Sequence, residues 1–200
     1  MKPLFLASKS KHRATLLSQL GLRFQVVSPK IKEIHIPQAD DSIIIETVQS
    51  NALRKARSLL SSISDGIIIS ADTVVITNSQ EVLGKPQTQT EAIEMLKKLV
   101  GKWHRVLSAV ALLNISTKQS LVDHDWASVK FRDVSLEGLH NYVATNEPIG
   151  KAGGYAIQGR GGFLVEQVQG SYTTVIGLPI ELTVSLLSSF NINIWQYWMP

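Results

Sequence analysis

The chain has 200 residues, no cysteine and a formal net charge of +4 at pH 7. The lack of cysteine excludes disulfides, thiolate zinc sites and a cysteine nucleophile, and it suits a reducing cytoplasm. The content of 44% hydrophobic and 18% charged residues is typical of a globular chain with a sizeable core. No run of about 18 apolar residues occurs, so no membrane span is expected. Basic residues are spread along the chain, which permits nucleic-acid binding without indicating it.

The first 60 residues predict two short strands and two helices. Residues 4–7 are a strand-sized apolar segment, and a helix is expected from a Ser10 N-cap to residue 20. Residues 24–27 predict a second strand. The segment 28–41 contains Pro29 and Pro37 and predicts a loop, followed by a helix over about 42–60.

The rest of the chain continues to mix strands and helices. Strands are predicted at residues 67–76, 103–114, 120–132 and 163–168. Helices are predicted at residues 91–99 (capped by Thr90), 136–144 (capped by Ser135) and 178–190. A glycine-rich block, 151–162, and an aromatic tail, 191–200, remain outside these elements. Because both kinds of element occur throughout, the predicted class is α/β or α+β.

Asp72 is the most informative single residue, because it is a lone carboxylate in the apolar run 66–76. Burial of an ionised carboxylate costs several kcal/mol or more, so the group needs a cation, hydrogen bonds or a function. In open α/β sheets reactive groups lie beyond the carboxyl ends of strands, and we expect Asp72 near such an end. Lys85 follows after a turn at Asn78–Gln80 and could join Asp72 in a site for a metal and an anionic substrate. The alternative is a structural aspartate that caps a turn.

Three further polar clusters fall at predicted element ends. Residues 8–13 lead from a strand into a helix N-terminus, where backbone N–H groups and an arginine can bind phosphate. Alone, such a segment is more often a simple helix cap. Lys55 alone would be a solvated lysine on a helix, and the block 151–162 alone would be a tight turn. Gly84-Lys85-Pro86 is not a phosphate-binding Walker loop, because proline follows the lysine.

The order and spacing of these clusters are more specific than any one of them. Nine motifs follow one another: Leu6–Ser10 with Arg13, Ala52–Ala56, Ala71–Val75, Gly84–Pro86, Gly101–Val106, Lys151–Tyr155, Ile157–Gly159, Gly170–Tyr172 and Val175–Pro179. With these motifs, the chain resembles the Maf family of nucleoside triphosphate pyrophosphatases from residue 4 to about 187. The segment Lys151–Gly159 resembles the branch that acts on dTTP and UTP.

The resemblance implies a fold, a reaction and an assembly. The fold would be α/β: a mixed central sheet flanked by helices, similar to the inosine triphosphate pyrophosphatase-like (Maf/Ham1) fold. One domain over residues 1–200 would form two lobes that share a nucleotide cleft, with 191–200 as a C-terminal tail. The reaction would hydrolyse dTTP, UTP and related non-standard pyrimidine nucleotides to the monophosphate and pyrophosphate. A divalent cation, Mg²⁺ or Mn²⁺, would assist attack of water, and a cytoplasmic homodimer is expected.

The resemblance also assigns roles to residues of this sequence. Asp72 and Glu33 would be the catalytic carboxylates and the metal ligands. The substrate-binding residues would be Ser8, Arg13, Lys55, Lys85 and Gln158. Such a site fits the chemistry of phosphoryl-type transfer, which depends on positioning and electrostatics and requires no protein nucleophile.

The chain departs from the family pattern in three places. In the segment Ser10–Arg13, Lys11 replaces a proline. His12 replaces an arginine, so its contact with the triphosphate would be weak or altered, because imidazole lacks the guanidinium fork. Lys32 replaces an acidic residue beside Glu33. Asn51 replaces a small apolar residue, which we interpret as a change in packing.

Two other functions remain open. The first is a weakly active nucleotide-binding regulator of cell division and septum formation, which His12 and Lys32 keep in consideration. The second is a nucleic-acid-binding protein, supported only by the sequence pI of about 9.3 and lacking interleaved aromatic and basic residues.

Overall fold

A mixed β-sheet forms the centre of the protein in a computed structural model that describes residues 2–35 and 38–198. Within these residues the sheet has seven strands in the order β2-β1-β3-β5-β6-β7, with β4 paired to β3. The strands are β1 (Leu4–Ala7), β2 (Phe24–Val27), β3 (Ile67–Thr77), β4 (Val82–Leu83), β5 (Trp103–Asn114), β6 (Ser120–Phe131) and β7 (Val165–Gly170). Strand β1 runs parallel to β2 and β3, whereas the other pairs are antiparallel. The expected mixed sheet is therefore confirmed.

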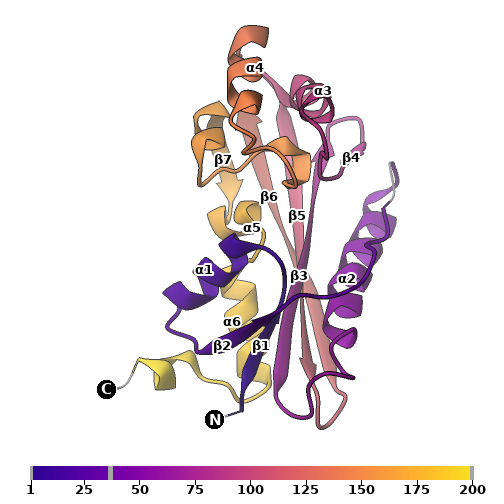
Figure 1. The fold of residues 1–200 in the computed structure, drawn as a ribbon, viewed down its shortest axis with the longest axis vertical. Helices are drawn as coiled ribbons and strands as arrows, with labels where there is room; N and C mark the ends of the chain where they lie inside the picture. Colours follow the sequence, from indigo (N-terminus) through magenta and orange to yellow (C-terminus); the bar gives the residue numbers. More distant parts are fainter. Residues whose placement is uncertain (1, 36–37, 199–200) are drawn as a thin grey trace.

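Helices cover both faces of this sheet (Figure 1). They are α1 (Lys11–Gln19), α2 (Asp41–Arg57), α3 (Gln89–Leu99), α4 (Leu136–Ala144), α5 (Tyr172–Ile176) and α6 (Ile180–Ser189), with 3₁₀ turns η1 (Ala152–Gly154), η2 (Arg160–Leu164) and η3 (Ile194–Tyr197). Side chains of β3 alternate between the faces. Ile67, Ile69 and Ala71 pack with α1 and α6, whereas Ile76 packs with α2. Asp72 therefore faces α2.

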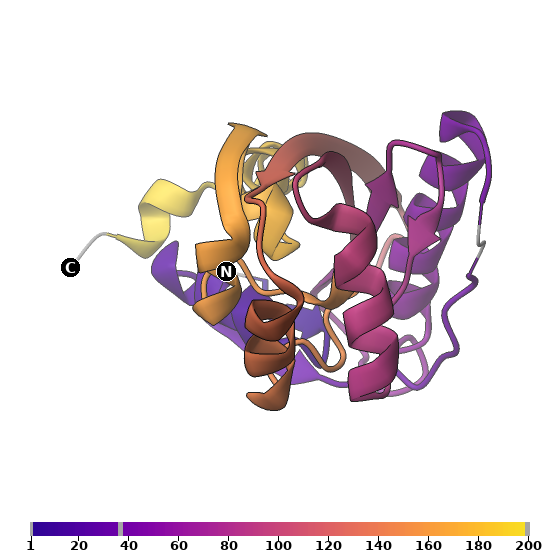
Figure 2. The same cartoon turned by 90° about the horizontal axis from the view of Figure 1, so that it is seen from above.

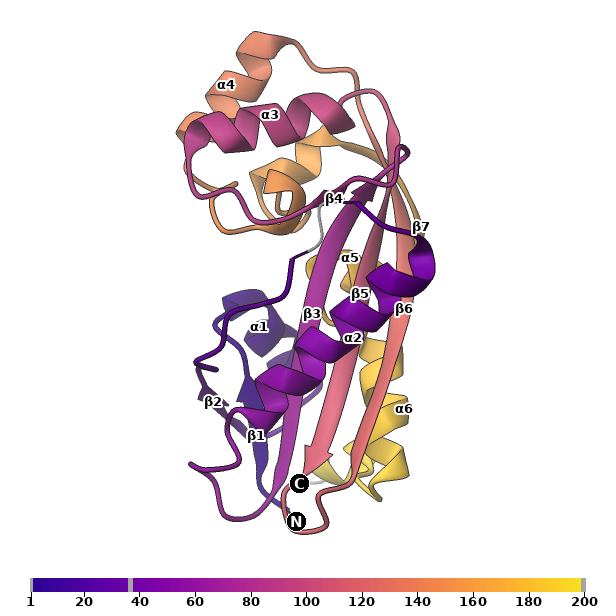
Figure 3. The same cartoon turned by 90° about the vertical axis from the view of Figure 1, so that its right-hand side faces the viewer.

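The long strands β3, β5 and β6 run along most of the length of the molecule, and α3 and α4 extend beyond one end of them (Figure 3). Helices α3 and α4 pack with η1 at one end, and α1, α2 and α6 lie along the other part of the sheet. Hydrophobic side chains fill each region, including the α3–α4 cluster around Leu96, Phe131 and Leu139. Among the described residues, no helix is long and apolar enough to cross a membrane.

The sequence prediction was wrong about the position of Asp72 in its strand. Asp72 lies in the middle of β3, because β3 pairs with β5 along its whole length, from Ile67 to Thr77. The parallel partner β1 is much shorter and pairs with β3 only as far as Ile69. Asp72 thus lies just past the end of the neighbouring strand β1 rather than at the end of its own.

Several smaller expectations also differ from the structure. Thr88, not Thr90, caps α3 by accepting a hydrogen bond from the Glu91 amide. The short helix α5 was not predicted. In the C-terminal tail, η3 projects on the side of the molecule away from α2 (Figure 2), and Trp198 Nε1 donates to the Leu20 carbonyl at 2.7 Å. Pro37 and the last two residues of the tail lie outside the described residues.

Candidate active site

A stretch of β3 with no neighbouring strand on one side forms the base of the candidate site. Strand β1 pairs with β3 only to Ile69, and β4 pairs with it at Val75 and beyond. Between these points the Ala71 carbonyl accepts a hydrogen bond from Arg13 Nη1 at 2.8 Å and one from Lys55 Nζ at 3.1 Å. Two cationic side chains thus satisfy the polar backbone that the missing strand would otherwise pair.

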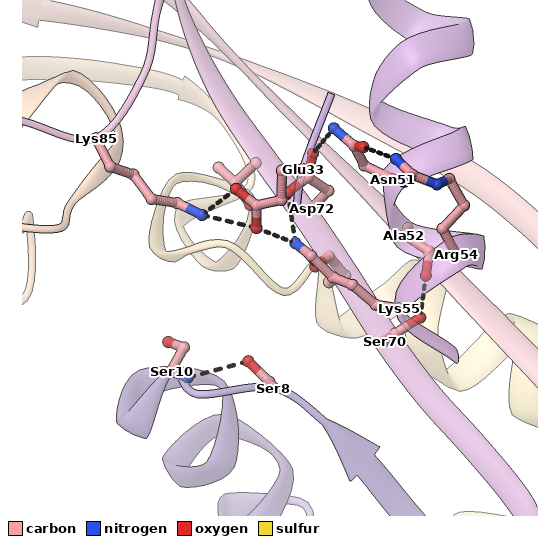
Figure 4. A network of polar contacts seen from close by, with 12 residues as sticks. Ser8, Ser10, Glu33, Asn51, Ala52, Arg54, Lys55, Ser70, Asp72 and Lys85 are labelled. Carbon is pink, nitrogen blue, oxygen red and sulfur yellow. Dashed lines mark hydrogen bonds and ion pairs between the residues drawn. The ribbon is translucent and has the colours of Figure 1, made fainter. Parts of the chain in front are cut away.

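Four charged side chains form a row of alternating sign next to this edge (Figure 4). Lys55 Nζ lies 2.6 Å from Asp72 Oδ1 and 2.6 Å from Glu33 Oε1. Lys85 Nζ lies 2.7 Å from Glu33 Oε2. Asp72 and Lys55 are almost entirely buried, whereas the Glu33 and Lys85 side chains are 35% and 36% exposed. The attraction between Asp72 and Lys55 therefore offsets the cost of burying their charges, whereas Glu33 and Lys85 remain accessible to a ligand.

The row changes the proton affinity of its members. Burial raises the pKa of the Glu33 carboxyl, but the ammonium groups of Lys55 and Lys85 outweigh it and lower that pKa to about 2. Burial lowers the pKa of Lys55, and Arg13 lowers it further, although Asp72 and Glu33 act in the opposite direction. Glu33 is consequently a carboxylate over the whole physiological pH range.

The loop between β1 and α1 forms another wall of the site. Ser8 is buried and its Oγ accepts a hydrogen bond from the Ser10 amide at 3.1 Å. Ser10 in turn caps α1, because its Oγ accepts from the Arg13 amide at 3.4 Å. Residues 8–13 all line the cleft. This arrangement places a helix N-terminus and its electropositive backbone at the cleft wall, where an anion would be stabilised.

Arg13 lies behind that loop, and its guanidinium already has three protein partners. Besides Ala71, these are the Gly177 carbonyl, which accepts from Nε at 2.7 Å, and Thr73 Oγ1, 2.9 Å from Nη2. Burial lowers the pKa of Arg13, while Asp72 and Glu33 oppose that shift. Arg13 also lines the cleft. Its contact with the triphosphate remains a prediction. Its visible action is to join α1, β3 and the turn after α5.

The segment 150–158 lines the far side of the cleft and carries Gln158, whose side chain is exposed. The turn that follows is held by the Glu147 carboxylate. Its oxygens accept hydrogen bonds from the Gly161 amide at 2.8 Å, the Arg160 amide at 3.0 Å and the Tyr142 hydroxyl at 3.0 Å. Glu147 thus fixes the backbone that presents Gln158.

The cleft has a volume of about 650 Å³ and gathers most of the residues that the sequence singled out. Those that line it are Ser8, His12, Arg13, Glu33, Lys55, Lys85 and Gln158. Asp72 does not line the cleft, because Lys55 lies between it and the opening and leaves it 2% exposed. The predicted proximity of Asp72 and Lys85 is indirect and runs through Lys55 and Glu33.

Glu33 and Asp72 are the residues that could hold a divalent cation. Carboxylate oxygens are the hard ligands that Mg²⁺ and Mn²⁺ prefer. Both carboxylates contact the single ammonium of Lys55, so their negative charge already converges on one cation. Within residues 2–35 and 38–198, no group of three or more His, Asp or Glu side chains forms a complete metal cage. A divalent cation held by both carboxylates would take the place that the Lys55 ammonium now has between them, and would complete its coordination with water and phosphate oxygens.

Sequence reasoning missed two residues of this site. Asn51 is a hydrogen-bonding residue next to Asp72 and not the change in packing that we expected. Its signal was a polar side chain four positions before Lys55, on the face of α2 that also carries the buried Val48 and Ala52. Glu147 had no such signal, because its partners are mostly backbone amides of residues more than ten positions away.

Comparison with known proteins gives consistent relatives. A family model described as "Maf-like protein" matches residues 3–190. The chain is 40% identical over 193 residues to a protein named dTTP/UTP pyrophosphatase from Dictyoglomus turgidum, covering 96% of this chain and 98% of the relative. It is 42% identical over 195 residues to a protein of the same name from Symbiobacterium thermophilum, covering 98% and 97%. A solved dITP/XTP pyrophosphatase from Mycobacterium abscessus is 15% identical over 99% of both chains with a TM-score of 0.47, which is too low to carry a conclusion.

Proposed function

The chain belongs to the Maf family, and we propose that it is a nucleoside triphosphate pyrophosphatase that hydrolyses dTTP, UTP and related non-standard pyrimidine nucleotides. The observation that carries the proposal is the row Asp72–Lys55–Glu33–Lys85, which opens into a cleft opposite the N-terminus of α1. The choice of pyrimidine nucleotides rests on the names of the relatives.

The cleft provides separate places for the two ends of a nucleotide. The triphosphate would lie between the loop 8–13 and the ammonium groups of Lys55 and Lys85, with Ser8 and Arg13 on one side. The base would lie toward Gln158, whose amide can both donate and accept hydrogen bonds. One cleft lined from α1, α2, β3 and the segment 150–158 supports the single domain with two lobes that the resemblance implies.

Water would add to phosphorus at the α–β bridge, the bridging P–O bond would break, and the monophosphate and pyrophosphate would leave. The proton of the attacking water would pass to Glu33, which lines the cleft, or to Asp72 once Lys55 has turned from it toward the phosphates. Lys55 and Lys85 would stabilise the negative charge that develops on pyrophosphate. Such catalysis depends on the positions of charges that are already fixed by the row.

We propose Mg²⁺ or Mn²⁺ as cofactor, held by Glu33 and Asp72 together with phosphate oxygens of the substrate. When bound, the cation would neutralise phosphate charge and lower the pKa of the attacking water.

Burial and the charge of Lys151 lower the pKa of His12. At neutral pH this residue would therefore act as a neutral hydrogen-bonding group at the cleft wall rather than as a replacement for the arginine charge.

The direct test is to incubate the purified protein with a panel of nucleoside triphosphates and Mg²⁺ or Mn²⁺ and to follow pyrophosphate and monophosphate. Release from dTTP and UTP is expected, with loss of turnover in Asp72→Asn. A matched control is Asp123→Asn, because Asp123 is an exposed aspartate on β6 outside the cleft. Nucleotide binding without turnover of any nucleotide would instead favour the nucleotide-binding regulator. The homodimer and the cytoplasmic location stay predictions.

A further inference from the structure

Asn51 lies one helical turn before Lys55 on α2 and is 2% exposed. Its side chain makes three hydrogen bonds of 3.0 Å or less. Figure 4 shows the one with Asp72, and a longer one of 3.4 Å in which Arg54 Nη1 donates to the Asn51 amide oxygen. The amide nitrogen donates to Asp72 Oδ2 at 3.0 Å and to the Ile34 carbonyl at 2.8 Å. The amide oxygen accepts from the Ile34 backbone N–H at 2.8 Å. One side chain therefore contacts both a carboxylate and the residue that follows the other carboxylate, Glu33.

These partners permit only one orientation of the Asn51 amide. A flipped amide would place its oxygen against the Asp72 carboxylate and the Ile34 carbonyl, both of which are acceptors. It would also place its NH₂ group against the Ile34 N–H, which is a donor. The three contacts are thus mutually consistent and mutually dependent, as in a fully satisfied buried network.

Glu33 depends on such a tether because its own segment has no regular structure. Residues 28–35 form neither helix nor strand. The two-point contact between Asn51 and Ile34 attaches this segment to α2, and α2 also carries Lys55. Asn51 therefore fixes the backbone of Glu33 relative to the ammonium group that Glu33 shares with Asp72.

We propose that Asn51 is a positioning residue that sets the relative placement of the two catalytic carboxylates. It holds Asp72 Oδ2, so that Oδ1 faces Lys55, and it holds Ile34, so that Glu33 reaches Lys55 from the cleft side. This role rests on the proposed pyrophosphatase function. A contact that acts only on geometry should affect turnover more than substrate affinity, because displacement of catalytic groups by about 1 Å can cost about 100-fold in rate.

The test compares two variants with a control on the same helix. Asn51→Ala removes these three contacts together with the 3.4 Å contact from Arg54. Asn51→Asp keeps the shape and an acceptor for the Ile34 N–H but removes both donated hydrogen bonds and places a carboxylate against Asp72. Gln49→Ala is the control, since Gln49 makes a side-chain contact with His124 and touches neither carboxylate. The measurements are kcat and KM for dTTP, thermal unfolding, and amide hydrogen exchange at Ile34 without metal or nucleotide.

We expect kcat to fall about 10- to 100-fold in both Asn51 variants, with KM within about threefold of wild type. Ile34 should exchange at least about tenfold faster in Asn51→Ala and stay closer to wild type in Asn51→Asp. Gln49→Ala should match wild type in kcat, in KM, in thermal unfolding and in amide exchange at Ile34. A kcat of Asn51→Asp within about threefold of wild type, in a protein that is folded, would overturn the proposal.

The same experiment separates failure of this inference from failure of the proposed function. If the wild-type protein hydrolyses no nucleotide, the pyrophosphatase proposal fails, and the catalytic side of the positioning role fails with it. Ile34 exchange still reports on the tether in that case, because it requires neither metal nor substrate. Unchanged exchange in Asn51→Ala would show that the segment 28–35 is held by other contacts.

Discussion

Lys55 donates a hydrogen bond of 2.6 Å to Asp72, although both side chains are almost completely buried. Removal of both charges from water is costly, and their mutual attraction and hydrogen bond offset this desolvation cost. Lys55 also satisfies the Ala71 carbonyl on the open edge of β3. The pair therefore serves the fold and the candidate chemistry together.

Loss of one partner should destabilise the protein more than loss of both. Lys55→Met leaves Asp72 buried with only Asn51 as a partner, and we expect the free energy of unfolding to fall by about 3–5 kcal/mol. The double variant Lys55→Met/Asp72→Asn should recover part of this loss and remain inactive. Urea unfolding of wild type, both single variants and the double variant measures the coupling. A double variant less stable than Lys55→Met would contradict the account.

Glu33 should make stability depend on pH in a defined window. Its folded pKa of about 2 lies below the ordinary 4.5, so its contribution is present above about pH 4.5 and lost as pH falls toward 2. Glu33→Gln should therefore be less stable than wild type at neutral pH, and the difference should shrink as the pH is lowered from about 5. Urea midpoints at several pH values test this. The control is Glu46→Gln, because Glu46 lies on the exposed side of α2. If its difference in stability from wild type shrank with falling pH in the same way, the result would argue against a specific role for Glu33.

The sequence predicted the elements well wherever hydrophobic periodicity and caps are local. The helix over residues 136–144 with its Ser135 cap matches α4, and the pair 103–114 and 120–132 matches β5 and β6 to within one residue. The predicted strand 67–76 matches β3 to within one residue, yet Asp72 lies in its middle and not near its end. The sequence could not show that the parallel neighbour β1 pairs with β3 only as far as Ile69, so that Asp72 lies past the end of β1 instead. Similarly, Thr88 and Thr90 are both reasonable caps, and only the three-dimensional course of the chain chooses between them.

The site was predictable in composition but not in its connections. Motif spacing indicated Lys55, Asp72 and Lys85, and the resemblance to the Maf family added Glu33. The structure places all four in one row. The order of the row, with Lys55 between the two carboxylates, depends on the approach of α2 to β3. Asn51 was misinterpreted because its partner Ile34 lies in an irregular segment, where the sequence carries no periodic signal.

Glu147 and Gln158 should act as a unit in substrate selection. Glu147→Ala would release the amides of Arg160 and Gly161, and the turn after Gln158 would lose its fixed shape. We expect kcat/KM for dTTP to fall about tenfold in Glu147→Ala and in Gln158→Ala, with little further loss when both are combined, because coupled residues are non-additive. A double-mutant cycle on kcat/KM is the measurement. Full additivity would show that the two residues act independently.

Gly153 is required where η1 approaches β3, and Gly101 provides a matched comparison. Both have a left-handed backbone, with φ of +67° and +68°. A Cβ at Gly153 would lie 2.8 Å from Val75 Cγ2, whereas one at Gly101 would meet nothing within 4 Å. Gly101→Ala should therefore lose about 1 kcal/mol of stability from its backbone alone. Gly153→Ala should lose about 1–3 kcal/mol more from the clash.

Gly153→Ala should also alter the cleft, because the Gly153 amide donates to the Gly84 carbonyl next to Lys85. Displacement of η1 from Val75 would disturb that contact and the position of the Lys85 ammonium group opposite Glu33. We therefore expect Gly153→Ala to lower turnover of dTTP as well as stability, and Gly101→Ala to leave turnover near wild type. Thermal unfolding and steady-state kinetics of both variants provide the comparison. Equal losses of stability and turnover in the two variants would mean that the left-handed backbone, and not the approach to Val75, is what requires glycine.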